Sequence, residues 1–325
     1  MSALSFGIIG VGHLGAIHAK VASQMTSLDL VGVYDTDLAR AQKVAEQVGV
    51  PAMTTLEELL EQVDAVSIVV PTVHHFEVAK KALDYGCHIF LEKPITATVD
   101  EARTIVRLAK EAGKKLQVGH IERFNPAVLA LEQYDLQPMF IESHRLSPFH
   151  PRGTDVSVVL DLMIHDLDII LALVNRPLQA VDASGVAVVS ESEDIASVRL
   201  TFDNGAVANI TTSRISVKAM RKMRIFQKDM YVAIDFLQKQ SEVFQLAGRD
   251  STGGQGMPVA TIGEGERARQ VVYEQPEVPA VNSMELELDR FAQAIDKGEH
   301  TPVTGEDGLR ALDVAETILR KIQSQ

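Results

Sequence analysis

The first 120 residues alternate between short apolar runs and longer segments with the periodicity of amphipathic helices. Apolar runs of strand length occupy residues 5–9, 30–34, 65–70, 87–91 and 115–119. The segments between them predict helices at residues 16–22, 38–48, 55–62, 76–85 and 99–112. Strands that alternate with helices of this length indicate βαβ units with parallel strands. We therefore predict a doubly wound α/β domain at residues 1–120.

After about residue 120 the pattern changes to strand-like segments that follow one another directly. These segments cover residues 138–146, 180–189, 195–202, 206–215, 222–227 and 230–235. Asp203-Asn204-Gly205 predicts a hairpin turn between two of them. Consecutive strands indicate a largely antiparallel sheet with one face covered. The sequence thus predicts a second α/β domain at residues 121–325, with a glycine-rich loop over 250–265 and closing helices at 283–297 and 305–321.

Residues 158–171 predict a buried helix that carries an unusual polar stripe. At about 100° per residue, Asp161, His165 and Asp168 fall within roughly a 60° arc, and apolar residues cover nearly all other directions. Asp166 points away from this stripe. Because unpaired burial of such groups costs several kcal/mol, the stripe must face a ligand, a metal or other polar groups.

A glycine motif stands between the first predicted strand and its helix. Gly10-Val11-Gly12-His13-Leu14-Gly15 has the G-x-G-x-x-G spacing in the strand-to-helix context that the motif requires. Gly10 permits the tight turn, Gly12 lets the backbone approach a pyrophosphate, and Gly15 lets the helix pack on the strand. The free N–H groups of the helix N-terminus face the phosphates. The motif predicts a Rossmann dinucleotide site.

The second predicted strand ends at a carboxylate that favours NAD. Asp35 follows Gly15 by 20 residues, the position from which a carboxylate accepts hydrogen bonds from the adenosine ribose. Asp37 adds negative charge that repels a 2′-phosphate, while Arg40 partly offsets it. We predict NAD as the cofactor, with NADP as the less favoured alternative.

Composition removes several function classes. The 325-residue chain has 31 basic and 44 acidic residues, a net charge of −13, which argues against nucleic acid as a partner. It has a single cysteine and therefore no disulfide framework or thiolate cluster. We see neither a signal peptide nor an apolar run long enough to span a bilayer. A cytoplasmic protein with no membrane partner is the resulting expectation.

Three motifs in this order resemble the Gfo/Idh/MocA oxidoreductases. They are the N-terminal nucleotide motif, Glu92-Lys93-Pro94 after a strand, and Asp161-x3-His165 on a helix, with Val303–Gly308 closing the match. The resemblance covers essentially the whole chain. It implies an N-terminal Rossmann domain and a C-terminal α/β domain with a large, mostly antiparallel open sheet. That open sheet implies a homodimer or homotetramer.

The resemblance also implies catalytic roles for three residues. Lys93 reaches the reacting hydroxyl, His165 takes its proton, and Asp161 orients the sugar or the imidazole. The chemistry agrees, because oxidising a carbinol needs a base for the O–H proton and a hydride acceptor above the C–H. A cation beside the developing alkoxide stabilises it. A metal has no part in this prediction.

Further site residues follow from the same motif match. Cofactor-binding positions are the three motif glycines, His13, Leu14, Asp35, Pro71, Thr72, His75, Glu92 and Lys93. Substrate-binding positions are Lys93, Arg123, Asn125, Asp161 and His165. For Arg123 and Asn125 an exposed helix-start cluster is the alternative. For Asp161 and His165 the alternative is a self-satisfied buried pair.

The substrate is the least constrained part of the prediction. Residues 118–126 and 144–155 resemble the branch of the family that oxidises the 3-hydroxyl of UDP-N-acetylglucosamine. Arg214 and the basic cluster Lys218–Arg224 could meet the diphosphate of a nucleotide sugar. The same cations could instead be solvated charges that protect an edge strand.

Three other functions stay open at this stage. The first is an inositol, free-sugar or dihydrodiol dehydrogenase on the same scaffold. The second is a lyase or isomerase whose metal is bound by Asp161, His165 and Asp168, a reading that leaves Lys93 and the glycine motif unexplained. The third is a non-catalytic dinucleotide sensor, for which no basic recognition helix is visible.

Overall fold

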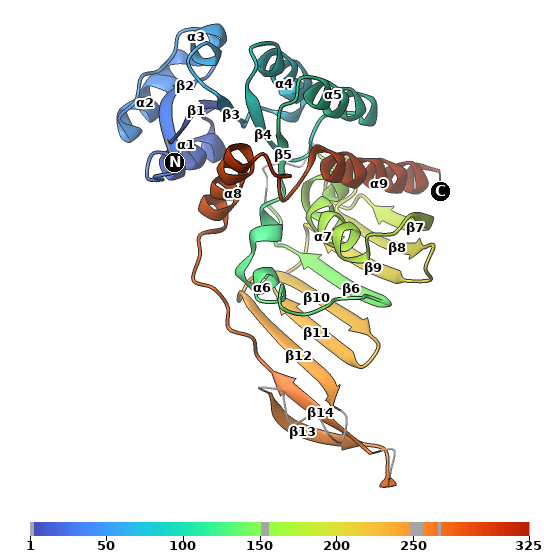
Figure 1. The fold of residues 1–325 in the computed structure, drawn as a ribbon. Coiled ribbons are helices and arrows are strands. Elements are labelled where there is room, and N and C mark those ends of the chain that lie inside the picture. The colour runs from blue at the N-terminus through green and yellow to red at the C-terminus, as the bar shows by residue number, and fades with distance from the viewer. Residues whose placement is uncertain (1–2, 151–155, 248–255, 266–267, 325) are drawn as a thin grey trace. The chain divides into compact units, whose positions relative to one another are not determined.

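The chain forms two compact units, which Figure 1 traces by residue number. The structure is a computed structural model that describes residues 3–150, 156–247, 256–265 and 268–324. Unit 1 consists of Met1–Ile121 and Val281–Asp313, and unit 2 consists of Glu122–Ala280 and Val314–Gln325. The predicted division at residue 120 did not include the return of the chain to unit 1.

Unit 1 contains a sheet of five parallel strands among its described residues. In chain order the strands are β1 (Leu4–Ile9), β2 (Leu28–Tyr34), β3 (Ala65–Ile68), β4 (His88–Glu92) and β5 (Leu116–Gly119). Their order in the sheet is β2-β1-β3-β4-β5, and every neighbouring pair is parallel. The predicted Rossmann sheet is confirmed, with each strand within two residues of its expected bounds.

Helices lie on both faces of this sheet. They are α1 (His13–Ala22), α2 (Leu38–Val48), α3 (Leu56–Leu60), α4 (His75–Asp84), α5 (Val99–Glu111) and α8 (Ser283–Lys297), with a 3₁₀ turn η1 at Thr72–His74. Phe6 and Ile8 of β1 share a core with α1, α2 and α8. Gly7 faces the other way, where a Cβ would lie 2.9 Å from Leu59 of α3. The contact of α8 with α1 and β4 explains why residues 281–313 belong to unit 1.

Side-chain caps fix the ends of the unit 1 helices. Asp37 accepts a hydrogen bond from the backbone N–H of Arg40 at the start of α2, which ends at Gly49 with φ 76°. Thr98 and Glu101 form a reciprocal capping box at the start of α5. Such caps satisfy N–H groups that the helix itself leaves without a partner.

Unit 2 is built on a sheet of nine described strands. They are β6 (Phe140–Leu146), β7 (Leu178–Val186), β8 (Ile195–Phe202), β9 (Val207–Ser213), β10 (Met220–Gln227), β11 (Met230–Asp235), β12 (Gln240–Ala247), β13 (Met257–Ile262) and β14 (Arg269–Glu274). The order is β13-β14-β12-β11-β10-β6-β9-β8-β7, with β6 and β9 the parallel pair. This large, mostly antiparallel sheet confirms the predicted fold class.

The sheet of unit 2 buries one face and exposes the other. Along β8 the buried residues alternate with Ser197 and Arg199, which are exposed. The predicted hairpin joins β8 to β9 through Gly205, whose φ is 83°. The short helix segments of this unit are η2 (Ile121–Phe124), α6 (Pro126–Leu129), η3 (Val159–Met163) and α7 (Ile164–Val174). Helix α9 (Gly305–Gln323) begins in unit 1 and ends in unit 2.

Three strands were missed by the sequence analysis. β12, β13 and β14 extend one side of the nine-stranded sheet. The predicted glycine-rich loop over 250–265 is wrong for residues 257–262, which form β13, while its residues 250–255 lie outside the described part of the chain. Residues 151–155 of the predicted substrate segment also lie outside it. A strand such as β13, exposed at every residue, lacks the alternation that reveals a half-buried strand.

The predicted continuous helix over 158–171 is two elements. Residues Val159–Met163 form a π-helical turn, and α7 follows from Ile164 to Val174. A π turn is wider than an α turn, so the 100° spacing does not hold across Asp161. Such turns inside helices are frequent at functional sites.

A buried ion network fixes α7 to the sheet. Arg145 of β6 is 2% exposed and donates to both carboxylate oxygens of Asp166, at 2.7 and 3.1 Å, and to Glu122 at 2.9 Å. Its guanidinium also lies 5.7 Å from the ring centre of Phe236. Burial alone would lower the pKa of Arg145, but Asp166 and Glu122 together raise it above its ordinary value. The charges are held because each is paired.

Replacing Arg145 tests this network. Arg145→Met keeps most of the side-chain volume but leaves two buried carboxylates without their cation, a loss worth roughly 3–5 kcal/mol. Arg107→Met is the control, because the exposed Arg107–Glu111 pair is worth about 0.5 kcal/mol or less. Urea unfolding of both variants measures the difference. Equal stabilities would contradict the assigned role of Arg145.

Candidate functional site

The glycine motif adopts the turn that its sequence predicts. β1 ends at Ile9, Gly10 has φ 84°, and α1 begins at His13. A Cβ on Gly10 would lie 2.7 Å from the backbone oxygen of Val69, and one on Gly15 would lie 1.9 Å from the oxygen of Gly10. Gly12 differs, since a Cβ there would meet no atom within 4 Å. Gly10 and Gly15 are therefore needed by the fold, whereas Gly12 leaves open space in front of a helix N-terminus.

A pocket of about 650 Å³ lies at the carboxyl ends of the unit 1 strands. It has the size of a cofactor site. The residues that were predicted for the cofactor and that line it are Gly10, Gly12, His13, Leu14, Asp35, Pro71, Thr72, His75, Glu92 and Lys93. Lining residues that sequence reasoning did not single out include Tyr34, Thr36, Leu56, His74 and Val78. The sequence marks these residues only by their position, at or after a strand end or on a neighbouring helix.

Asp35 stands at one end of this pocket with both oxygens oriented by the backbone. The N–H of Val11 donates to Oδ2 at 2.9 Å, and the N–H of Asp37 donates to Oδ1 at 2.9 Å. Nη1 of Arg40 lies 3.3 Å from each oxygen. Asp35 is 8% exposed, whereas the Arg40 side chain is 49% exposed and is also paired with Asp37. The carboxylate is thus fixed, and the arginine beside it is at the surface.

Glu92, at the end of β4, lines the same pocket, and His18 and the backbone N–H of Lys93 fix its carboxylate. Its Oε1 lies 3.1 Å from Nε2 of His18, and its Oε2 accepts the N–H of Lys93 at 3.2 Å. His18 is fully buried on α1, and its Nδ1 lies 3.0 Å from Oγ of Ser67. The sequence analysis did not single out His18. Its position about one turn after Gly15, on the buried side of α1, was the available signal.

His75 braces the wall of the pocket. Its Nδ1 lies 2.8 Å from the backbone oxygen of Pro94, and its Nε2 lies 3.0 Å from that of Val70. Burial lowers the pKa of His75, against the opposing effect of the two carbonyl oxygens and Glu92. A neutral imidazole carries one N–H, so His75 donates to one of these carbonyls at a time. Its contacts join the segment after β3 to the segment after β4.

The predicted polar stripe of unit 2 is divided by its partners. Asp168 is 1% exposed and accepts two hydrogen bonds from Arg123, both at 2.7 Å. Asp166, which was placed outside the stripe, pairs with Arg145. Asp161 lies in the π turn and His165 in the first turn of α7, and both are partly exposed. The two ion pairs on α7 fix how the helix is rotated about its axis, and with it the direction of His165.

Arg123 and Asn125 have partners within the fold. Arg123 forms the bidentate pair with Asp168 that is described above. Asn125 donates to Glu122 and to the backbone oxygen of Phe236, and its Oδ1 accepts the N–H of Ala127 to cap α6. Both ends of the Asn125 amide are therefore engaged in structural contacts. Asn125 therefore starts α6, but it is buried, and the exposed cluster of the alternative interpretation is not found at this residue.

Comparison with known proteins places the chain in a family. A family profile described as "Oxidoreductase family, NAD-binding Rossmann fold" matches residues 4–120, and the GFO/IDH/MocA C-terminal domain matches residues 133–230. A UDP-N-acetylglucosamine 3-dehydrogenase of Acidithiobacillus ferrooxidans is 37% identical over 312 residues, which are 95% of this chain and 94% of that protein. The chain belongs to the Gfo/Idh/MocA oxidoreductases.

Other relatives agree with this membership. A scyllo-inositol 2-dehydrogenase (NAD(+)) of Bacillus subtilis is 30% identical over 228 residues, covering 64% of this chain and 67% of that protein. A solved structure of the A. ferrooxidans enzyme matches with a TM-score of 0.89 and 35% identity, over 100% of this chain and 99% of that one. The predicted family resemblance is confirmed, and so is its leaning toward the UDP-N-acetylglucosamine 3-dehydrogenases. An NAD(P)-binding oxidoreductase is the function that the family establishes.

The basic cluster Lys218–Arg224 is divided between the two faces of the sheet. Lys222 pairs with Asp235 and Arg224 with Glu142, whereas Arg221, next to Lys222 on β10, pairs with Glu122 in the buried network. The edge-strand reading is wrong, since β10 lies between β11 and β6 inside the sheet. Side chains on β10 alternate between the two faces of the sheet, so Arg221 and Lys222 do not face one diphosphate together.

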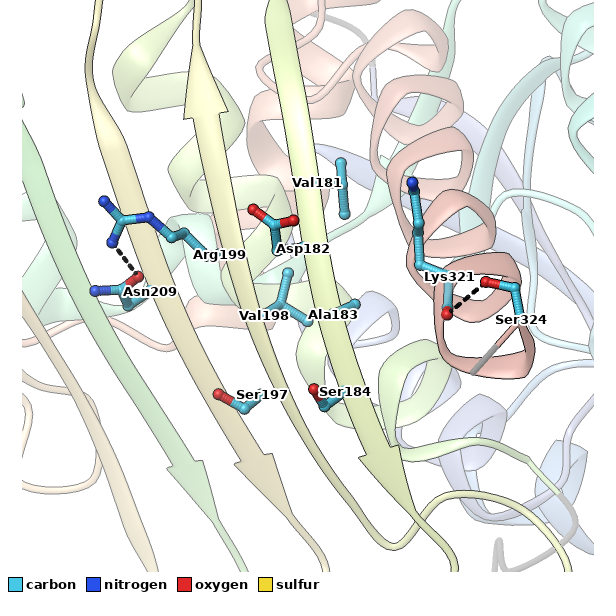
Figure 2. Close-up of a pocket in the computed structure, with 10 residues that line it drawn as sticks. All are labelled: Val181, Asp182, Ala183, Ser184, Ser197, Val198, Arg199, Asn209, Lys321 and Ser324. Atoms are coloured by element: carbon cyan, nitrogen blue, oxygen red, sulfur yellow. Dashed lines mark hydrogen bonds between the residues drawn. The ribbon is translucent and has the colours of Figure 1, made fainter.

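A second pocket, of about 470 Å³, lies at β7, β8 and the end of α9 (Figure 2). Its polar lining residues are Asp182, Ser184, Ser197, Arg199, Asn209, Lys321 and Ser324. Arg199 donates to Asn209 at 3.1 Å. None of the predicted site residues of this Gfo/Idh/MocA protein lines it.

Two structural findings bear on the alternatives. Within the described part of the chain, no group of three or more His, Cys, Asp or Glu side chains is placed to hold a metal ion. The metal-lyase alternative therefore has no ligand cluster there. Among the same residues, no helix combines the length and apolar character needed to cross a membrane.

The open space at Gly12 provides a test of the dinucleotide site. Gly12→Ala should fold like wild type, because its Cβ meets nothing in the protein, but it should bind NADH at least roughly tenfold more weakly, because the methyl blocks the approach of the pyrophosphate. Gly15→Ala should instead lower the unfolding temperature, since its Cβ meets the Gly10 carbonyl. Thermal unfolding and NADH fluorescence titration separate the two effects. Normal NADH affinity in Gly12→Ala would place the phosphates elsewhere.

Proposed function

We propose that the chain oxidises the 3-hydroxyl of a UDP-N-acetyl sugar and uses NAD as the hydride acceptor. The observation that carries this proposal is the 37% identity, over 95% of the chain, to the A. ferrooxidans UDP-N-acetylglucosamine 3-dehydrogenase. The pocket of unit 1 supports the cofactor, because its glycine turn, helix N-terminus and ribose-facing Asp35 fit the parts of a dinucleotide. The product is a 3-keto sugar.

The residues of the protein have separable roles in this reaction. The bound nicotinamide supplies the hydride acceptor. Lys93 ends the pocket of unit 1 with a cation that stabilises negative charge on the reacting oxygen. His165 receives the hydroxyl proton, which an imidazole does well near neutral pH. Asp161 lies four residues before His165 and orients the sugar or the imidazole.

An inositol dehydrogenase is the second candidate. It is favoured by the 30% identity to the scyllo-inositol 2-dehydrogenase (NAD(+)) of B. subtilis, although the match covers only 64% of this chain. Purified protein with NAD should form NADH with UDP-N-acetylglucosamine and not with inositols or free sugars. Turnover with an inositol alone would replace the first candidate by the second. If the protein binds NAD but turns over none of these substrates, the non-catalytic dinucleotide sensor becomes the favoured hypothesis.

We propose further that the protein acts in the cytoplasm as a homodimer or homotetramer that associates through the open sheet of unit 2. A row of aromatic rings on its exposed face supports this, with neighbouring ring centres 4.9–5.9 Å apart. The row runs across five strands through Phe140, Phe226, Tyr231, Phe244 and Tyr273. Aromatic side chains contribute strongly to protein interfaces. Light scattering of the intact chain measures its oligomeric state.

Substitution of the two proton-handling residues tests the mechanism. Lys93→Met and His165→Ala should each lower kcat by about 10²–10⁴-fold, the size of a general acid–base contribution, and should leave NADH binding intact. Lys80→Met and His300→Ala are the controls, because Lys80 is exposed on α4, His300 is exposed after α8, and neither residue lines the pocket. Near-normal kcat in either test variant would remove that residue from proton transfer.

A second substitution tests the choice of cofactor. Asp35→Ser removes the carboxylate that receives the ribose hydroxyls and leaves Arg40 free to meet a 2′-phosphate. The ratio of kcat/KM for NAD to that for NADP should fall by at least about tenfold, a change of about 1.4 kcal/mol. Reversal of this shift in the double variant Asp35→Ser/Arg40→Ala would assign the NADP contact to Arg40. An unchanged ratio in Asp35→Ser would remove Asp35 from the adenosine site.

A further inference from the structure

Two buried polar side chains and one partly exposed carboxylate form a hydrogen-bonded chain at the pocket of unit 1. Ser67 of β3 and His18 of α1 are both 0% exposed. Ser67 Oγ lies 3.0 Å from His18 Nδ1, and His18 Nε2 lies 3.1 Å from Glu92 Oε1. Glu92 alone of the three lines the pocket. The chain of contacts therefore runs from the interior of unit 1 to a carboxylate at the pocket surface.

The donor and acceptor capacities of these groups fix the direction of the chain. The Ser67 hydroxyl can donate to Nδ1, which leaves the single N–H of a neutral imidazole at Nε2 to donate to Glu92. The other Glu92 oxygen accepts the N–H of Lys93. Two N–H donors on the two oxygens are the partners that a carboxylate anion requires. Ser67 lacks access to solvent, so the arrangement is not a hydrolytic triad.

A glycine on the neighbouring strand leaves room for the carboxylate. A Cβ on Gly119 of β5 would lie 2.9 Å from Oε1 of Glu92. Any larger residue there would displace Glu92 from His18. The His18 imidazole thus holds the Glu92 carboxylate, and the absence of a side chain at Gly119 leaves the space that the carboxylate occupies.

The strand order places Glu92 far from the adenosine end of the pocket. Asp35 follows β2 and Glu92 ends β4, and the sheet order β2-β1-β3-β4 separates them by three strand spacings, about 14 Å. A dinucleotide with its ribose on Asp35 and its pyrophosphate at the β1 turn therefore extends toward Glu92 with its nicotinamide. The oxidised nicotinamide ring carries a positive charge, which is lost on reduction, so a nearby anion stabilises the oxidised form more than the reduced form.

On these grounds we propose that His18 is a positioning residue that holds the Glu92 carboxylate at the nicotinamide end of the pocket. The pair makes the site favour oxidised over reduced dinucleotide more than it would without the pair. This inference rests on the proposed NAD function. It adds a physical reason why the protein would bind NAD⁺ in preference to NADH. His18 acts through Glu92 and has no contact with the pocket of its own.

The experiment measures the affinities for NAD⁺ and NADH separately in the intact chain, by isothermal titration calorimetry. The quantity of interest is the ratio of the NADH dissociation constant to the NAD⁺ dissociation constant. Lys93 is kept in every variant, so its charge cancels when ratios are compared. Glu92→Gln should lower the ratio by roughly tenfold, because it removes the anion while keeping the shape. His18→Leu should lower it in the same direction.

A conservative variant and a matched control complete the design. His18→Gln retains an N–H that can reach Glu92 and should keep most of the wild-type ratio. His88→Leu removes another partly buried histidine from the opposite end of β4, where it accepts the N–H of Lys115, and should leave the ratio unchanged. Where His18→Leu does not fold, Glu92→Gln together with His18→Gln carries the test.

The outcomes separate this inference from the proposed function. A lowered ratio in Glu92→Gln and His18→Leu, with recovery in His18→Gln, supports the positioning role. An unchanged ratio in Glu92→Gln, or equal weakening of both dissociation constants in His18→Leu, would overturn it, because a merely structural role affects both redox forms alike. Failure of the wild-type chain to bind either form would overturn the proposed NAD function and this inference together.

Discussion

The buried guanidinium of Arg145 ties α7 and η2 to the sheet of unit 2. Arg145 is 2% exposed and binds Asp166 of α7 and Glu122 of η2 at once. Because each charge alone would be costly to bury, this network couples the stability of β6, α7 and η2. A second ion pair joins the partly exposed Arg123 of η2 to the buried Asp168 of α7. His165 comes directly before Asp166 and three residues before Asp168 on α7, so these ion pairs constrain how its side chain is oriented.

The same principle shapes the pocket of unit 1. Asp35 and Glu92 are carboxylates near its two ends, and each accepts backbone N–H groups that keep it in place. Between them lies the N-terminus of α1, which favours negative charge. The cations Arg40 and Lys93 also line the pocket, beside Asp35 and Glu92 respectively. The pocket thus combines fixed carboxylates, a helix N-terminus and two cations, the kinds of group that bind the hydroxyls and phosphates of a dinucleotide.

Local sequence patterns predicted the parts of the fold that local physics determines. The strands and helices of unit 1 have clear periodicity, and the turn at Gly10 follows from its spacing to Gly12 and Gly15. The partners of buried charges could not be predicted, because Arg145 and Asp166 are 21 positions apart and His18 and Glu92 are 74 apart. The basic cluster was misread for a related reason. Neighbours along β10 lie on opposite faces of a sheet whose strand order the sequence does not reveal.

In the proposed reaction, hydrogen leaves carbon 3 of a nucleotide sugar and passes to the nicotinamide. The most direct measurement uses UDP-N-acetylglucosamine carrying deuterium at carbon 3, with mass spectrometry of the reduced cofactor after turnover. The NADH formed should contain the deuterium, and the sugar product should be a ketone at carbon 3. NADH that forms without deuterium would show that another carbon is oxidised, and would contradict the proposed reaction.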